Sequence, residues 1–202
     1  DSSTNKEEAF LGVPPAHYTK ESADALYLGV GTGISVGASS LLFDNITAIE
    51  INPLFLELLP QFAEQNFHLH ERENVKFLVD DGLNYLFRTE KKYDAIINNV
   101  PHPQHFAGSK LWSEKAYREV SQHLKPGGVY SQWMIDAFGW EGTKIVTKTL
   151  FKVFEHCNLF ILSHGFYQFT CSHSPLNLKE GKSWPNALTK HLPKIAKSPI
   201  QF

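Results

Sequence analysis

Three features that would each point to a particular class of protein are scarce in this sequence: cysteine, an excess of charge of one sign, and long apolar runs. Only two of the 202 residues are cysteines. Cys157 and Cys171 lie far from the CxxC spacing of metal and redox sites and sit in apolar surroundings, so we expect buried free thiols rather than a disulfide. Because free thiols are typical of reducing compartments, the cysteine pattern predicts a cytoplasmic protein.

Charge is almost balanced, with 19 Lys and Arg residues against 21 Asp and Glu residues and a formal net charge of -2. A protein without a general positive field does not attract a phosphate backbone, so we expect no nucleic-acid partner. No run approaches the roughly 18 apolar residues that a membrane-spanning helix needs. Residues 1–5 also lack the basic-then-apolar pattern of a secretory signal, and we expect no membrane partner.

What the sequence does contain is an alternation of short apolar runs with helical patterns. Hydrophobic residues make up 42% of the chain and charged residues 20%, the balance of a globular protein. The alternation predicts an α/β fold: a Rossmann-like, doubly wound, mostly parallel sheet of seven strands with a C-terminal antiparallel hairpin. We assign residues 1–24 to a lead-in segment, 25–175 to one domain and 176–202 to a C-terminal tail. The strands are expected at residues 25–28, 46–51, 75–79, 93–97, 129–134, 158–163 and 166–172, and the helices at 35–43, 54–65, 84–88, 113–124 and 143–154.

Glycines and acids follow three of these predicted strands. A glycine loop at residues 29–33 follows the first strand, Glu50 ends the second, and Asp81 with Gly82 follows the third. Ligands of parallel sheets bind outside the carboxyl ends of the strands, where glycines admit a close ligand and an acid accepts ribose hydroxyls. The loop does not keep the GxGxxG spacing of dinucleotide sites. A plain tight turn at the glycines, with Glu50 capping a helix and Asp81 starting a turn, stays open as the simpler interpretation.

Five motifs together resemble the spermidine synthase family in order and in spacing. The resemblance covers roughly residues 10–172 and is closest to divergent spermidine-synthase-like proteins with a Gly-Thr-Gly-Ile loop. It implies a class I methyltransferase-like fold that binds S-adenosylmethionine, its decarboxylated form or methylthioadenosine, with no metal. The motifs are residues 28–35 (LGVGTGIS), 48–53 (AIEINP), 81–86 (DGLNYL), 93–97 (YDAII) and 124–129 (LKPGGV).

The resemblance also assigns binding roles within these motifs. It implies a loop that cradles the nucleoside, an acid that binds the ribose, and a contact to the adenine. The residues that match these roles are Gly29, Gly31, Thr32 and Gly33 in the loop, Glu50 at the ribose, and Asp81 with Gly82 at the adenine.

The transfer chemistry of the resembled family is not matched as well. Where the family has an aspartate that holds the donor amine, this chain has Thr32, and where it has two aspartates after the fourth strand, this chain has Asn99 and His102. An attacking ammonium has no lone pair until a base removes its proton. Ordinary spermidine synthesis is therefore doubtful for this sequence. The small β-domain that precedes the fold in the family is also not evident in residues 1–24.

Two residues of the loop after the fourth predicted strand suggest other chemistry. His102 has the side chain whose ordinary pKa suits proton removal near neutrality, so it is a candidate base. Asn99 begins a segment that is loosely similar to the Asn-Pro-Pro-Tyr element of amino-group methyltransferases. Our leading hypothesis is a transferase that uses S-adenosylmethionine or its decarboxylated form with an altered acceptor site. An amine methyltransferase and a catalytically silent nucleoside-binding module are the alternatives; the expected partners are a nucleoside donor and an amine acceptor, and a homodimer stays open.

Overall fold

A computed structural model describes residues 7–100, 108–135, 139–163, 165–177 and 200–201. Its eight-stranded sheet has the order β3-β2-β1-β4-β5-β7-β6-β8. The first five strands are parallel, β6 and β7 form an antiparallel hairpin, and a two-residue β8 adds to β6, which confirms the predicted fold class. The strands are β1 Asp24–Leu28, β2 Asn45–Glu50, β3 Val75–Val79, β4 Tyr93–Asn98, β5 Leu124–Ile135, β6 His156–Ser163, β7 Phe166–Ser172 and β8 Ile200–Gln201.

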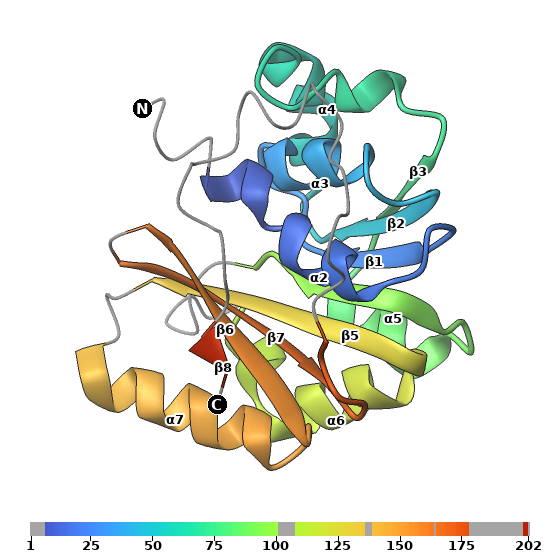
Figure 1. Ribbon diagram of the computed structural model, residues 1–202. Coiled ribbons are helices and arrows are strands. Elements are labelled where there is room, and N and C mark those ends of the chain that lie inside the picture. The colour runs from blue at the N-terminus through green and yellow to red at the C-terminus, as the bar shows by residue number, and fades with distance from the viewer. Residues whose placement is uncertain (1–6, 101–107, 136–138, 164, 178–199, 202) are drawn as a thin grey trace.

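Helices cover both faces of this sheet. Figure 1 shows α2 and α3 on one side and α6 and α7 on the other. No helix in the described ranges is both long enough and apolar enough to cross a lipid bilayer. The α-helices are α2 Val13–Tyr18, α3 Ile34–Ser39, α4 Pro53–Leu58, α5 Gly82–Arg88, α6 Glu114–Gln122 and α7 Gly139–Phe151, and the 3-10 helices are η1 Leu59–Phe62, η2 Leu69–Glu71 and η3 Ser109–Trp112.

Side chains along β1 alternate between the two faces of the sheet, and the core accordingly forms two layers. Leu26 and Leu28 belong to the cluster that also contains residues of α5, α6 and α7. Ala25 and Tyr27 point the other way, into the cluster beneath α2 and α3. Successive side chains of a strand face opposite sides, so a strand that is apolar at every position must be covered on both faces.

The helix after β2 is shorter than the sequence pattern predicts. We expected a helix through residue 65, but α4 ends at Leu58 and continues as the 3-10 helix η1. Pro60 explains the break, because proline has no N–H to donate to the preceding turn. Of the apolar stripe on this segment, Leu59 is buried, whereas Leu54 and Leu58 are exposed.

The prediction of free thiols is wrong. Cys157 and Cys171 are joined in a disulfide. The two residues are directly opposite each other in the antiparallel pairing of β6 with β7, with their Cα atoms 4.1 Å apart. Their separation of 14 residues matches no local cysteine motif, so only the hairpin register brings them together. The argument from free thiols to a reducing compartment therefore loses its basis.

Candidate functional site

The loops that follow β1 and β4 meet at the carboxyl edge of the sheet. The Gly29 N–H donates to the carbonyl oxygen of Ile49 at 2.8 Å, and the Asn99 N–H donates to that of Leu28 at 2.9 Å. The Asn99 side-chain amide donates to the Gly29 carbonyl at 3.4 Å. These backbone ties hold the glycine loop between the ends of β2 and β4, as the predicted topology requires.

Glu50 holds the glycine loop from the end of β2. Its Oε2 accepts hydrogen bonds from the backbone N–H groups of Val30 at 2.9 Å and Gly31 at 3.2 Å, and its Oε1 accepts from Asn52 at 3.0 Å. The side chain is 6% exposed. A carboxylate has about four acceptor positions, so roughly one remains for a ligand hydroxyl. Glu50 therefore both shapes the loop and keeps limited capacity to bind a ribose.

The two later glycines of the loop have different reasons to be glycine. At Gly33 the backbone φ is +81°, and a Cβ would lie 2.7 Å from side-chain carbons of Leu59 and Leu69. At Gly31 the φ is +57°, but a Cβ would meet nothing within 4 Å. Gly33 thus packs the loop against the helices, while Gly31 borders open space beside Glu50. That open space fits the nucleoside cradle expected there.

Asp81 caps the helix that follows β3. Its Oδ1 accepts hydrogen bonds from the backbone N–H groups of Leu83 and Asn84, both at 3.0 Å. The simpler interpretation gave the helix cap to Glu50 and a turn to Asp81, whereas the structure has a cap at Asp81. Neutral Asn52, rather than Glu50, caps α4 by accepting from the Leu54 N–H. Because only one Asp81 oxygen is used by the cap, capping does not exclude a ligand contact through the other.

A small cavity of about 70 Å³ lies beside Asp81. Its lining combines aliphatic side chains, which suit the faces of a flat base, with the polar groups of Asp80, Asp81 and Lys110. Asp80, also on this cavity, forms an ion pair with Arg88, which partly neutralises it. The cavity is lined by Ile51, Asp80, Asp81, Gly82, Leu83, Val100, Gly108, Lys110 and Leu111.

Thr32 contacts an acid from a distant part of the chain. Its hydroxyl donates to Oε2 of Glu8 at 3.2 Å. Burial raises the pKa of the Glu8 carboxyl, and the hydrogen bond from Thr32 opposes that rise. The side-chain amide of Asn66 meanwhile donates to the Thr32 carbonyl at 3.3 Å. The loop position without its own acid therefore has a carboxylate next to it.

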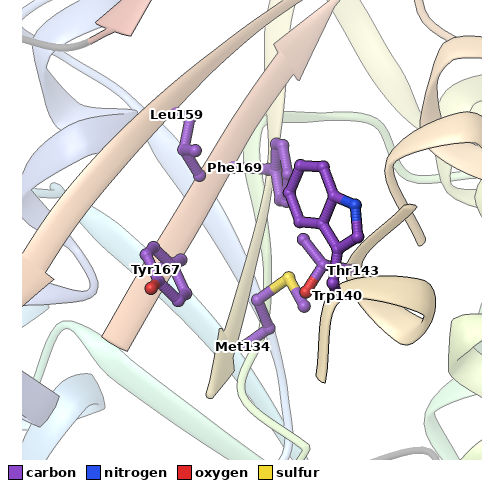
Figure 2. Close-up of a pocket in the computed structure, with 6 residues that line it drawn as sticks. All are labelled: Met134, Trp140, Thr143, Leu159, Tyr167 and Phe169. Atoms are coloured by element: carbon purple, nitrogen blue, oxygen red, sulfur yellow. The ribbon is translucent and has the colours of Figure 1, made fainter. Parts of the chain in front are cut away.

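A second, larger hollow lies between α7 and the hairpin. Figure 2 shows Trp140 and Thr143 of α7 facing Met134, Tyr167 and the strand residues opposite. Two adjoining cavities, of about 200 and about 270 Å³, share part of their walls, and we call them together the α7 pocket. Met134 lies near the carboxyl end of β5 and pairs with Tyr167, so the pocket opens near the same edge as the glycine loop. The pocket residues are Met134, Trp140, Thr143, Lys144, Thr147, Lys148, Leu159, Tyr167 and Phe169.

The structure brings most of the predicted site together and adds residues that sequence reasoning missed. The glycine loop, Glu50 and Asn99 are tied to one another by hydrogen bonds, and Asp81 with Gly82 lines the neighbouring cavity. His102 lies outside the described residues. Two residues near the site were not predicted. Glu8 has no local motif that marks it, whereas Ile51, which lines the cavity beside Asp81, could have been found as an apolar residue directly after Glu50. Within the described ranges, no group of three His, Cys, Asp or Glu side chains is arranged to hold a metal ion.

Comparisons with known sequences agree on one family. The sequence model described as the spermine/spermidine synthase domain matches residues 30–162, more than half of the chain. The polyamine aminopropyltransferase of Buchnera aphidicola is 28% identical over 90 residues, which is 44% of this chain and 31% of that protein. That of Sulfurisphaera tokodaii is 23% identical over 134 residues, 64% of this chain and 44% of that protein. The chain thus spans less than half the length of these curated relatives.

Solved structures agree on the fold. A spermidine synthase in complex with the transition-state analogue AdoDATO superposes with a TM-score of 0.73 at 19% identity, covering 93% of this chain and 75% of that one. Human methyltransferase-like protein 13 in complex with SAH superposes with a TM-score of 0.65 at 19% identity, covering 94% and 87%. At such identities the likeness establishes the shared architecture alone.

Proposed function

Because the chain belongs to the spermine/spermidine synthase family, we propose that it is a transferase that binds S-adenosylmethionine, its decarboxylated form or methylthioadenosine at the carboxyl edge of the sheet. The observation that carries the proposal is the buried Glu50, which accepts the N–H groups of the glycine loop and retains acceptor capacity beside the open space at Gly31. The adenosyl-type ligands named for two structural neighbours, AdoDATO and SAH, support the choice of ligand.

The acceptor of this transferase, we propose, is not an ordinary polyamine. Thr32 and Asn99 occupy positions where the resembled family has acids, and neither carries charge. The α7 pocket near the same edge is lined by Lys144 and Lys148, and no acidic side chain of a described residue lines it. Such a lining offers no carboxylate to a molecule with several ammonium groups, which is therefore disfavoured there.

Two alternatives are supported by particular residues. The amide of Asn99 contacts the glycine loop, where an amide oxygen is able to orient an amine for methyl transfer. The lack of acid at Thr32 and Asn99 instead favours a silent module that only binds the nucleoside. These alternatives share the donor site and differ in the product formed.

The proposal is tested by titration calorimetry with S-adenosylmethionine, its decarboxylated form and methylthioadenosine. Saturable binding of at least one is expected, and no binding of any of the three would refute the nucleoside site. Mass spectrometry of reactions with putrescine and with less charged amines then separates the candidates. Aminopropylated putrescine as the main product would refute the altered acceptor site, a methylated amine would indicate the methyltransferase, and binding without any product would favour the silent module.

The sequence leaves a homodimer open, and this question needs its own measurement. Sedimentation velocity of the purified chain, with and without methylthioadenosine, measures its state of assembly.

A further inference from the structure

The segment before β1 places one acid, Glu8, beside the glycine loop. Residues 7–10 are helical, and Ala9 and Phe10, which follow Glu8, are buried in a cluster with Ile34 and Ala38 of α3. This packing holds Glu8 over the start of α3, where its Oε2 accepts the hydrogen bond from the Thr32 hydroxyl at 3.2 Å. The position of the carboxylate is therefore set by the core.

Glu8 has no cationic partner among the described residues. No ion pair between described residues involves its carboxylate, and its hydrogen bond comes from a neutral hydroxyl. Burial of an acid without a compensating cation is unfavourable, and it raises the pKa of the Glu8 carboxyl. A cationic group placed here would relieve this cost and would bind more strongly than it does to an exposed acid.

Glu50 and Glu8 contact successive residues of the glycine loop. Glu50 binds the N–H groups of Val30 and Gly31, and the next residue, Thr32, contacts Glu8. For a nucleoside whose base lies at Asp81 and whose ribose lies at Glu50, the inference requires the sulfur-bearing end to extend along the loop toward Glu8. In S-adenosylmethionine and its decarboxylated form, that end carries an ammonium group on the chain attached to sulfur; methylthioadenosine has no such group.

We propose that Glu8 binds the ammonium group of the nucleoside donor, so that this chain supplies from its N-terminal segment the carboxylate that its glycine loop lacks. The inference rests on the proposed function, because it requires a nucleoside in the glycine loop. It goes beyond that function by naming the charge that the donor must carry. The chain thereby selects donors with an ammonium group over methylthioadenosine.

The test compares decarboxylated S-adenosylmethionine with methylthioadenosine by titration calorimetry. The wild-type chain should bind the ammonium-bearing ligand more tightly. Glu8→Gln keeps the shape of the side chain and removes its charge, so it should lower affinity for that ligand by about tenfold or more while leaving affinity for methylthioadenosine unchanged. Glu7→Gln, which removes the same charge from the neighbouring residue, is the matched control and should change neither.

A rescue variant separates ligand binding from a purely structural role. Because the Thr32 hydroxyl lies 3.2 Å from the Glu8 carboxylate, Thr32→Asp in the Glu8→Gln background returns a negative charge to almost the same place. It should restore the preference for the ammonium ligand. Equal losses for both ligands in Glu8→Gln would show that Glu8 only anchors the segment, and unchanged affinity for both would show that it does not face the ligand; either result overturns the inference.

The proposed function and this inference fail in different ways. If methylthioadenosine and both amine-bearing donors do not bind the wild-type chain, the nucleoside site is refuted and the inference with it. If methylthioadenosine binds but Glu8→Gln leaves the ligand preference intact, the nucleoside site stands and only the role of Glu8 is overturned. Thermal unfolding of each variant shows whether it is folded before its affinities are compared.

Discussion

The acids at the two edges of the parallel sheet have different kinds of partner. At the amino edge, Lys125 contacts Asp24 at 2.8 Å and Asp94 at 2.7 Å, and Lys20 lies 3.5 Å from Asp94. Lys125 holds the pKa of the Asp24 carboxyl below its usual value, and the two acids together raise the pKa of the Lys125 ammonium. Charge at this edge is neutralised within the chain, and its role is to join the starts of β1, β4 and β5.

At the carboxyl edge Asp80 pairs with Arg88, but the three acids assigned to the ligand site are held by neutral donors instead. Glu50 and Asp81 accept backbone N–H groups, and Glu8 accepts a hydroxyl. Such hydrogen bonds orient a carboxylate without cancelling its charge. The difference therefore separates acids whose charge is neutralised within the chain from acids that remain able to attract a ligand.

Glu50→Ala should give the largest effect. It removes the acceptor of three backbone N–H groups, and each buried donor left without a partner costs about 1–3 kcal/mol. We expect the free energy of unfolding to fall by about 3 kcal/mol and nucleoside affinity to fall at least about tenfold. Denaturant unfolding and calorimetry measure the two effects. The exposed Glu57→Ala on α4 is the control, and an equally small effect of both variants would contradict the role of Glu50.

Lys125→Met should destabilise the chain without changing nucleoside affinity. Asp94 is largely buried and loses its closest cation, so we expect a loss of about 1–2 kcal/mol in the free energy of unfolding. The contribution of the lowered Asp24 pKa is full above the ordinary value of 3.8 and is lost as pH falls below it. That of the raised Lys125 pKa is full below 10.5 and is lost as pH rises above it.

The stability difference between wild type and Lys125→Met should therefore be greatest between these two values, as denaturant unfolding at several pH values measures. Lys152→Met removes an exposed ion pair with Glu114 and should lower the free energy of unfolding far less than Lys125→Met. A fall in nucleoside affinity in Lys125→Met would contradict the different roles that we assign to the two edges.

Acidification should abolish the ligand preference that we assign to Glu8. Only the ionised carboxylate attracts an ammonium, and burial raises its pKa above the ordinary 4.5. As pH falls through the raised value, the ratio of affinities for decarboxylated S-adenosylmethionine and methylthioadenosine should drop by about tenfold. Calorimetry at several pH values from neutrality down to 4.5 measures the ratio. Glu8→Gln should show a flat ratio, and a parallel fall in the wild type and in this variant would assign the titration to another group.

Asp81 should affect stability less than Glu50 or Lys125. Asp81→Ala removes the cap of α5 and should lower the free energy of unfolding by about 1 kcal/mol, whereas Asp81→Asn keeps a capping oxygen and should be nearly neutral. If Asp81 also contacts the base, both variants should weaken nucleoside binding. Binding that weakens only in Asp81→Ala would indicate that the cap, and not the charge, is what the site requires.

Sequence patterns predicted the features that depend on neighbouring residues. Ser113, the first residue of the helix predicted at 113–124, accepts the Ala116 N–H as the N-cap of α6. The apolar runs of β1 and β4 predicted a sheet covered on both faces, because each strand is apolar at nearly every position. The exposed face of α4 was not predicted, since an apolar stripe indicates a helix but does not say what packs on it.

The sequence by itself determined the fold class, the glycine loop and the acids at the strand ends, because strand period, turn residues and parallel connections are local rules. Only the tertiary structure decided how those residues are used. The disulfide of Cys157 with Cys171 follows from hairpin register, and Glu8 reaches Thr32 across 24 residues because buried neighbours pack its segment on α3. Contacts between distant segments depend on how the layers close over one another, and no spacing along the chain encodes that closure.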